Sequence, residues 1–276
     1  MRYIFCLLLC VCFITFGLTA CHKDEDIAAL KDEIKQRWNI EVVDHNLQDT
    51  LRALLVSKSS VAQLQDVSPK NEGACLKVVI QAFSIYPAHF IKSLISRVAV
   101  ADTITTWSIE VGGFNFDNTI AIDCDDVHGQ GMLSADFLQK WKTDNIHAFI
   151  ARIILEQHKW LFQNQDWQSY NPSDFHYGNM EDYKNSLRDH SPNKRNENNT
   201  YFTSGFITQL GMTAIDQDFP DYAMRIFGEP REFAQIIRKY PRVKGKARIV
   251  MNIYLTLAPE LKSFFDQSGL TDAVKN

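Results

Sequence analysis

The chain has 276 residues, a formal net charge of −4 and a hydrophobic content of 45%. These values are typical of a globular protein with a sizeable core and allow one large domain or two small ones. Acidic residues outnumber basic ones, and no basic patch of the kind that nucleic-acid binding requires is present, so we expect no nucleic-acid partner.

The first twenty residues have the features of a secretory signal. Arg2 supplies a positive start, an apolar run extends from Tyr3 to Phe16, and small residues precede Cys21. The apolar run is too short to span a bilayer. Residues 1–20 are therefore predicted to be a signal peptide that the mature protein lacks.

The segment Leu18-Thr19-Ala20-Cys21 resembles a bacterial lipobox, in which the cysteine is acylated and becomes the first residue. Acyl chains on that residue would anchor the protein durably in a membrane. The alternative is an ordinary signal peptide with an incidental cysteine. Residues 22–26 resemble the lysine-plus-acidic export signal of Bacteroidetes surface lipoproteins. We therefore predict that residues 21–26 form a lipidated cysteine with an acidic tether, on the outer membrane and facing the cell surface.

Two cysteines are left once the signal and the lipidated residue are set aside. Cys75 and Cys124 would then lie in an oxidising compartment, where two thiols can pair. The sequence does not give their separation, so a disulfide and two free buried thiols both remain open.

Amphipathic spacing predicts helices in the first third of the chain. They are expected at residues 27–38, 47–55 and 76–83, and a fourth is expected to open at Pro87. Residues 38–43 alternate between apolar and polar, which predicts a short strand.

After Arg97 the composition changes to β-branched residues, which favour strands. Strands are predicted at residues 98–100, 105–111 and 119–124, with turns at Gly112-Gly113 and Asp117-Asn118. An acidic cluster follows, made of Asp123, Asp125, Asp126 and His128. It lacks the closing glutamate of an EF-hand loop, so we interpret it as a solvated strand end.

Residues 144–162 are predicted to form the helix around which the rest of the chain is organised, with Asp144 as its N-cap. Four of its side chains are of types found at metal or proton-transfer sites: His147, Arg152, Glu156 and His158. The two histidines would lie about 16 Å apart along an ideal helix, too far to share one metal ion. The simpler interpretation is a buried helix with a polar outer side.

The last third of the chain begins with an aromatic loop at residues 167–178. The polar run 179–200 is expected to be the least ordered internal segment. Pro220 is expected near the start of a helix that stops at residues 228–230. A final helix is predicted from near Val243, with a break at Pro259. Helices on both sides of a small sheet indicate one α+β domain over residues 27–276.

The order of these parts resembles the zinc-binding metallopeptidase lipoproteins of Bacteroidetes, in particular the substrate import-associated zinc metallohydrolase lipoproteins. The resemblance rests on the lipobox and export signal, Tyr86-Pro87, the mid-chain strand and helix, the W-x-x-x-N-P and F-x-Y-G motifs of residues 167–178, Gly205-Phe206 and Asp221-Tyr222-Ala223. It implies a mainly helical, gluzincin-like metallopeptidase fold and an association with SusC/SusD-type nutrient uptake proteins.

Such families carry a His-Glu-x-x-His motif on the central helix and a third, acidic ligand in a Glu-Asp-x-Ala-Glu segment. The first motif falls here on residues 152–156 or 154–158, so the general-base position is Ile153 or Leu155. In the acidic segment, Pro220 and Met224 replace both flanking carboxylates. We therefore predict no catalytic residue, metal ligand or cofactor. The vestigial site positions are Arg152, Ile153, Glu156, His158, Pro220 and Met224.

Two classes of function follow. The first is a non-catalytic binding or accessory subunit of an uptake complex. It would bind through the cleft that holds the metal site in the resembled family, or through the aromatic loop around Trp167, Tyr170 and Tyr177. The second is an active hydrolase with a rebuilt zinc site, for which Glu156, His158 and His176 are the available donors.

Overall fold

The structure is a computed structural model that describes residues 27–54, 62–125, 135–188 and 199–275. It is mainly helical with a small mixed sheet, which confirms the predicted α+β class. The predicted signal peptide (1–20), and Cys21 with its tether (21–26), where lipidation is predicted, lie outside the described residues. Within the described residues, no single helix is long and apolar enough to cross a membrane. Helices α4 (Pro69–Phe83) and α5 (Ala88–Leu94) meet those criteria only as a pair bent by 112°.

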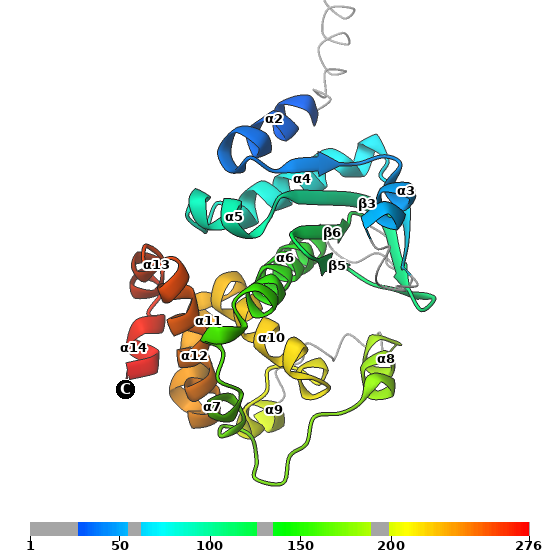
Figure 1. Ribbon diagram of the computed structural model, residues 1–276. Helices are drawn as coiled ribbons and strands as arrows, with labels where there is room; N and C mark the ends of the chain where they lie inside the picture. The colour runs from blue at the N-terminus through cyan, green and yellow to red at the C-terminus, as the bar shows by residue number, and fades with distance from the viewer. Residues whose placement is uncertain (1–26, 55–61, 126–134, 189–198, 276) are drawn as a thin grey trace, which may run out of the picture.

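The first half of the chain forms the sheet and the helices around it (Figure 1). The helices are α2 (Ile27–Trp38), α3 (Leu47–Leu54), α4 (Pro69–Phe83) and α5 (Ala88–Leu94). The strands are β1 (Glu41–Val43), β2 (Ala62–Asp66), β3 (Arg97–Thr106), β4 (Ile109–Glu110), β5 (Gly113–Phe116) and β6 (Thr119–Asp123). Strand β2 was not predicted, because its short polar sequence carries little β signal.

Strand β3 is the centre of the sheet. Its first half pairs in parallel with β1 on one side and β6 on the other, and its second half pairs antiparallel with β2 and β4. Strand β5 pairs antiparallel with β6. Alternate residues of β3 face opposite sides, so Val98 and Val100 join the main core while Ala99 and Ala101 join a smaller core on the other face.

The hairpin between β3 and β4 turns at Trp107 and Ser108, which have φ angles of 49° and 60°. The prediction of separate strands at 98–100 and 105–111 was wrong, because β3 is one continuous strand up to this turn. The Trp107 ring contacts Tyr183 of α8 (Met180–Arg188) edge-on, with the ring centroids 6.1 Å apart. The expected turn at Asp117-Asn118 is confirmed, whereas Gly113 lies within β5.

Helix α6 (Ala135–Gln157) links the two halves of the molecule, running between the sheet and the C-terminal helices (Figure 1). It begins well before the predicted N-cap, so the assignment of Asp144 to that role was wrong. Asp144 is buried inside the helix and accepts a hydrogen bond from Lys140 Nζ at 2.7 Å. The polar residues between Lys140 and Asp144 hid this first part of the helix.

The second half of the chain is helical. It contains η1 (Lys159–Leu161), α7 (Asn164–Gln168), α8 (Met180–Arg188), α9 (Asn199–Ser204), η3 (Leu210–Met212), α10 (Ile215–Gly228), α11 (Pro230–Lys239), α12 (Pro241–Leu257), α13 (Leu261–Gln267) and α14 (Leu270–Lys275). Helix α8 lies in the run that was expected to be least ordered, and α11 was not predicted. Helix α12 ends two residues before Pro259, as the sequence predicts.

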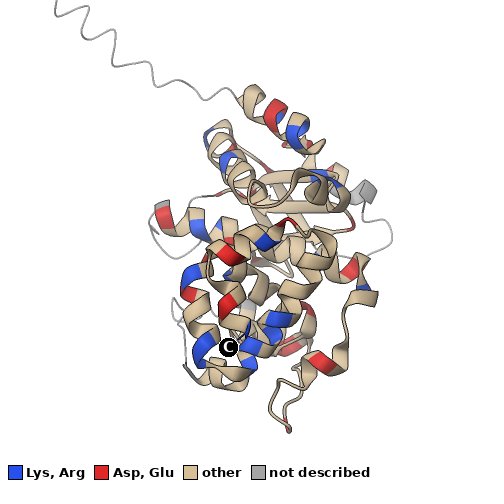
Figure 2. Ribbon diagram, turned by 90° about the vertical axis from the view of Figure 1, so that its left-hand side faces the viewer, with Lys and Arg blue, Asp and Glu red and all other residues tan. Residues whose placement is uncertain are grey.

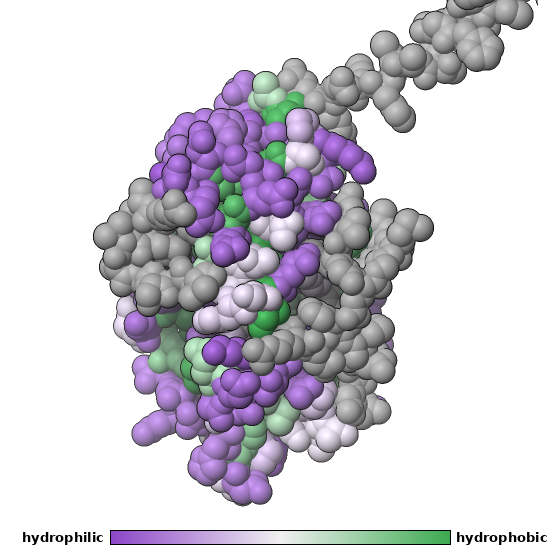
Figure 3. Space-filling view, turned by 90° about the vertical axis from the view of Figure 1, so that its right-hand side faces the viewer, coloured by the Kyte–Doolittle hydropathy of each residue, from purple (hydrophilic) through white to green (hydrophobic). Residues whose placement is uncertain are grey.

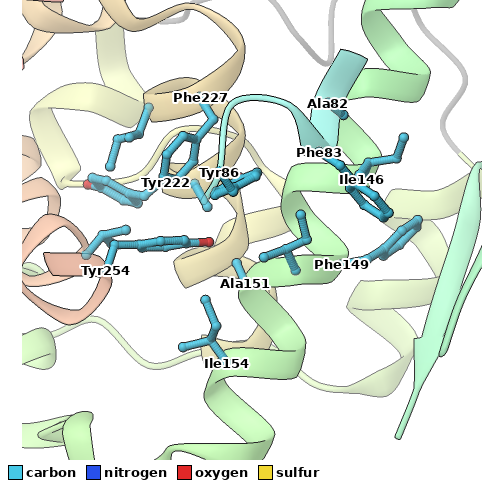
Figure 4. Close-up of a cluster of buried hydrophobic side chains, with 14 of the residues drawn as sticks. Ala82, Phe83, Tyr86, Ile146, Phe149, Ala151, Ile154, Tyr222, Phe227 and Tyr254 are labelled. Atoms are coloured by element: carbon cyan, nitrogen blue, oxygen red, sulfur yellow. The ribbon is translucent and has the colours of Figure 1, made fainter. Parts of the chain in front are cut away.

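The core is continuous from the sheet to the C-terminal helices. A cluster of aromatic and aliphatic side chains joins Tyr86, α6, α10 and α12, and Tyr86, Phe227 and Tyr254 meet at its centre (Figure 4). Lysines, arginines and acidic residues are interspersed on the helices in Figure 2. Hydrophilic side chains dominate the face in Figure 3, with apolar ones scattered between them.

The sequence left open whether Cys75 and Cys124 form a disulfide or remain free thiols. In the structure Cys75 of α4 and Cys124 are joined by a disulfide, with their Cα atoms 5.5 Å apart. Both side chains are buried. The bond ties the helical layer to the end of the sheet.

Candidate functional site

Helices α6 and α10 form the most extensive helix pair among the described elements. Their contact is apolar because each has a buried stripe at helical spacing, which includes Ile146, Ile150 and Ile153 on α6 and Phe219 and Ile226 on α10. The positions predicted to be vestigial lie on these two helices, except His158, which follows the end of α6. The structure therefore brings the two motif regions side by side.

Arg152 projects from α6 to the start of α10. Its Nε atom donates a hydrogen bond to the backbone oxygen of Asp216 at 3.3 Å, and its Nη2 atom donates to Oε1 of Gln217. Its guanidinium carbon also lies 5.6 Å from the centroid of the Phe149 ring. Arg152, at the first position of the motif, thus binds neighbouring groups of the fold.

Pro220 lies inside α10, so its predicted place at the helix N-terminus was wrong. A proline has no backbone N–H, and in a helix that missing donor would serve the carbonyl oxygen four residues earlier. That oxygen belongs to Asp216, the acceptor of the Arg152 hydrogen bond. Two of the vestigial positions are therefore linked: Pro220 removes a helix hydrogen bond, and Arg152 supplies a donor to the carbonyl left over.

The other positions on α6 differ in burial. Ile153 and Ile154 are buried in the core, with exposed fractions of 0% and 1%, whereas Leu155 is half-buried and Glu156 is exposed. A general base at position 153 would therefore face the core, and a ligand at position 154 would do the same. On α10, Met224 is half-buried. These residues do not fit a zinc ion held in the manner of the resembled family.

The proposed donors for a rebuilt metal site are not gathered at one place. His158 was predicted to lie on the helix surface, but α6 ends at Gln157 and His158 is the residue before η1. Its ring lies edge-on to Trp160, with the centroids 6.5 Å apart. His176 is exposed in the aromatic loop. Among the described residues, no group of three or more His, Cys, Asp or Glu side chains is placed to hold a metal ion.

His147, the other histidine on α6, is a core residue. Its Nδ1 atom lies 2.9 Å from the hydroxyl of Tyr86, one of the aromatic residues labelled in Figure 4. Burial lowers the pKa of His147 to about 3, so the ring is neutral at neutral pH. This fits the structural interpretation of the helix.

A buried polar cluster lies around Asp218 of α10, and sequence reasoning missed it. Oδ2 of Asp218 accepts hydrogen bonds from Lys246 Nζ of α12 at 2.6 Å, Tyr177 Oη at 2.7 Å and Trp167 Nε1 at 2.9 Å. Lys246 Nζ also donates to the carbonyl oxygen of Gly205 at 2.9 Å. The side chains of Asp218 and Lys246 are both 0% exposed.

Aromatic rings enclose the ammonium group. Lys246 Nζ lies 4.0 Å from the ring centroid of Phe206, 5.0 Å from that of Trp167 and 6.0 Å from that of Tyr222. Burial raises the pKa of Asp218 and lowers the pKa of Lys246, although their mutual attraction opposes both shifts. Both shifts favour the uncharged forms of the pair.

This cluster revises the prediction for the aromatic loop. Trp167 is fully buried, and Tyr177 is half-buried with its hydroxyl bonded to Asp218. Tyr170 packs so closely on α12 that a Cβ at Gly245 would lie 2.0 Å from its ring. Trp167 is thus a core residue, whereas Tyr170 and Tyr177 are half-buried, and ligand binding by this loop stays a prediction.

Gly205 and Gly211 belong to the same region, and each has a physical reason to be glycine. Gly205 has a φ of 84°, a conformation that suits glycine, and presents its carbonyl oxygen to Lys246. A Cβ at Gly211 would lie 2.7 Å from Oδ2 of Asp221. Burial raises the pKa of Asp221 to about 7, and Thr208 donates a hydrogen bond to this carboxyl.

A signal in the sequence could have indicated the cluster. Lys246 lies three residues after Val243 and four before Val250, both of which are buried, so it occupies a core position of its helix. Asp218 likewise lies four residues, about one helical turn, before the fully buried Tyr222. A charged residue at a core-periodic position requires a buried partner.

For Asp123, the last residue of β6, the interpretation of the acidic cluster as a solvated strand end was wrong. Asp123 is 0% exposed, and its carboxylate accepts hydrogen bonds from the backbone N–H groups of Ile104 and Asp125. Burial raises the pKa of Asp123 to about 8. Asp126 and His128 lie outside the described residues.

Comparison of the chain with family models, with curated proteins and with solved structures gives no match.

Proposed function

We propose that the chain is a surface-anchored lipoprotein with a gluzincin-like metallopeptidase fold whose zinc ligands and general base have been replaced. In this proposal it is a non-catalytic binding or accessory component of a SusC/SusD-type nutrient uptake system. The anchor is Cys21, and the domain begins at residue 27, after the acidic tether.

The observation that carries the proposal is the link between Arg152 and the helix that contains Pro220. In the resembled family, these two places supply a ligand and a flanking carboxylate. Here the Arg152 guanidinium donates to the Asp216 carbonyl oxygen, which Pro220 leaves without its helix donor. Arg152 is a cation and Pro220 has an apolar side chain, so neither can donate an electron pair to a metal. They are linked instead through the carbonyl oxygen of Asp216.

The chemistry of zinc hydrolysis supports the same conclusion. A metal-bound water becomes a nucleophile near neutral pH, and a nearby carboxylate must accept its proton. The two residues that occupy the base position in the alternative alignments are Ile153 and Leu155, and neither can accept a proton. Ile153 is also fully buried, so its position faces packed side chains.

The accessory role rests on the lipobox, the acidic export signal and the resemblance to lipoproteins associated with substrate import. A protein tethered to the outer leaflet beside an uptake complex needs only a binding surface. The exposed side chains Trp160 and Met180, 68% and 56% exposed, are apolar groups that such a surface could use.

Elemental analysis of the full chain, purified without added metal, tests the loss of the zinc site. We expect zinc far below one ion per chain and no cleavage of casein or of an unstructured peptide mixture. Zinc near one ion per chain, abolished by His158→Ala and retained by the matched control His45→Ala, would overturn the proposal in favour of an active hydrolase.

Cross-linking in the native cell tests the accessory role. A tagged chain is cross-linked at the cell surface, and the partners are identified by mass spectrometry. We expect SusC/SusD-type proteins to be enriched with the intact chain and lost with Cys21→Ser, which lacks the anchor. Equal recovery of these proteins with both chains would contradict the proposal.

A further inference from the structure

Asp218 and Lys246 meet under conditions that differ from those of an ordinary ion pair. Lys246 Nζ lies 2.6 Å from Oδ2 of Asp218, and both side chains are fully removed from solvent. Three aromatic rings, those of Phe206, Trp167 and Tyr222, surround the amine. Desolvating two charges is expensive, so a buried pair of this kind favours the neutral amine and the neutral acid.

The hydrogen bonds of the Asp218 carboxyl are unequally divided between its two oxygens. Oδ2 accepts from Lys246, Tyr177 and Trp167. Oδ1 is buried and has no hydrogen-bond partner among the described residues. An unpartnered buried acceptor is destabilising, so a well-packed core should not retain it without a reason.

We propose that Lys246 and Asp218 are joined by an intramolecular amide bond that forms spontaneously in the folded chain. The Nζ atom of the neutral amine attacks Cγ of the neutral carboxyl. A bond forms between Nζ and Cγ, and the bond between Cγ and Oδ1 breaks. The departing hydroxyl takes one proton from Nζ and leaves as water, so atoms and electrons balance and no oxidant or cofactor is needed.

The local hydrogen bonds suit the product better than they suit the separate side chains. In the amide, Oδ2 becomes the carbonyl oxygen and keeps the donors Tyr177 and Trp167. The remaining N–H keeps its acceptor, the carbonyl oxygen of Gly205. The unpartnered Oδ1 is the atom that departs. Each polar atom left at the junction therefore has a partner.

The fold also supplies the conditions for the reaction. Amide formation in water is opposed by solvent and by the charges of both groups, whereas here the groups are held in contact and water is excluded. Tyr177 and Trp167 donate to the oxygen on which negative charge develops during the attack. The bond would connect α10 to α12 across 28 residues of sequence.

Peptide mapping of the unaltered full chain, reduced and digested with trypsin, tests the proposal directly. We expect one branched peptide that contains both Asp218 and Lys246, lighter than its two linear parts together by the mass of one water. Trypsin should also fail to cleave after Lys246. Recovery of the two linear peptides without the branched one would overturn the proposal, as would a loss of water that maps to other residues.

Variants add a check on the chemistry. Asp218→Asn should give the same branched peptide as the unaltered chain, because loss of ammonia from the amide side chain leaves an identical product. Lys246→Arg should give none. The matched control is Lys142→Arg, which changes another buried lysine, one that donates to the carbonyl oxygen of Cys124. This control should retain the branched peptide. Its loss in the control would contradict an assignment to Asp218 and Lys246.

Discussion

The guanidinium of Arg152 donates a hydrogen bond to the backbone of Asp216, the residue one helical turn before Pro220. This contact replaces the hydrogen bond that α10 loses at its proline. It also means that the two residues should not contribute independently to stability. The coupling between them is measurable.

A double-mutant cycle on Arg152→Met and Pro220→Ala measures this coupling. Arg152→Met should cost about 1 kcal/mol more in the natural background than in the Pro220→Ala background, where the helix regains its own donor. The free energy of unfolding in urea gives the four values. Arg152 also contacts Gln217, so Gln217→Ala with Arg152→Met serves as a second cycle. An equal cost of Arg152→Met with and without Pro220 would contradict the compensation.

Asp123 predicts a pH dependence of stability. Burial raises its pKa from 3.8 to about 8, so between these values the folded chain holds a proton that the unfolded chain releases. Its contribution to stability is therefore complete below pH 4 and is lost as the pH rises to about 8. Relative to Asp123→Asn, the natural chain should lose stability across this window. A difference in free energy of unfolding that stays constant from pH 4 to pH 8 would refute the assignment.

The disulfide between Cys75 and Cys124 predicts the absence of these two thiols. Ellman titration of the denatured, unreduced mature chain should detect neither of them. The bond closes a loop of 49 residues, so the double substitution to alanine should lower the free energy of unfolding by about 3–4 kcal/mol. Reduction of the natural chain should have a similar effect. Two titratable thiols in the unreduced protein would show that the bond does not form in solution.

Lipidation at Cys21 remains a prediction from the sequence. The mature protein should partition with membranes and incorporate labelled palmitate, since acyl chains supply the binding energy of the anchor. Cys21→Ser should abolish the label and leave the protein soluble or unprocessed. Cys6→Ser, which changes a cysteine within the predicted signal, is the matched control and should retain the label. An unlabelled, soluble protein with Cys21 intact would contradict the anchor.

The helices that the sequence predicted best are those whose apolar spacing is continuous. Helix α2 has the predicted bounds, and the break before Pro259 follows from the chemistry of proline. The start of α6 was missed because Lys142 and Asp144, polar in the sequence, are buried. Lys142 donates to the carbonyl oxygen of Cys124, outside the helix, and Asp144 accepts from Lys140 of the same helix. Periodicity in a single helix cannot reveal partners that only the tertiary structure supplies.

The same limit applies to the candidate site. The proposal that metal-binding motifs have been replaced was readable in the sequence, since Ile153 and Pro220 cannot perform the required chemistry. The use of Arg152 as a hydrogen-bond donor to α10 was not, because it depends on how α6 and α10 pack. The core-periodic position of Lys246 indicates that this lysine needs a buried partner. The identity of that partner, Asp218, becomes evident only when α10 and α12 are adjacent, because a whole helix separates the two residues in sequence.

The hairpin at Trp107 shows how a tertiary contact can determine a turn sequence. Both turn residues have left-handed backbone angles, which asparagine and glycine adopt more easily than tryptophan or serine. The left-handed backbone conformation is unfavourable for Trp107. The contacts of its ring with Tyr183 and Lys184 of α8 offset this cost. The hairpin is therefore fixed at its far end by another part of the chain. A homologue that lacks α8 should lose the reason for this tryptophan and return to an ordinary asparagine-glycine turn.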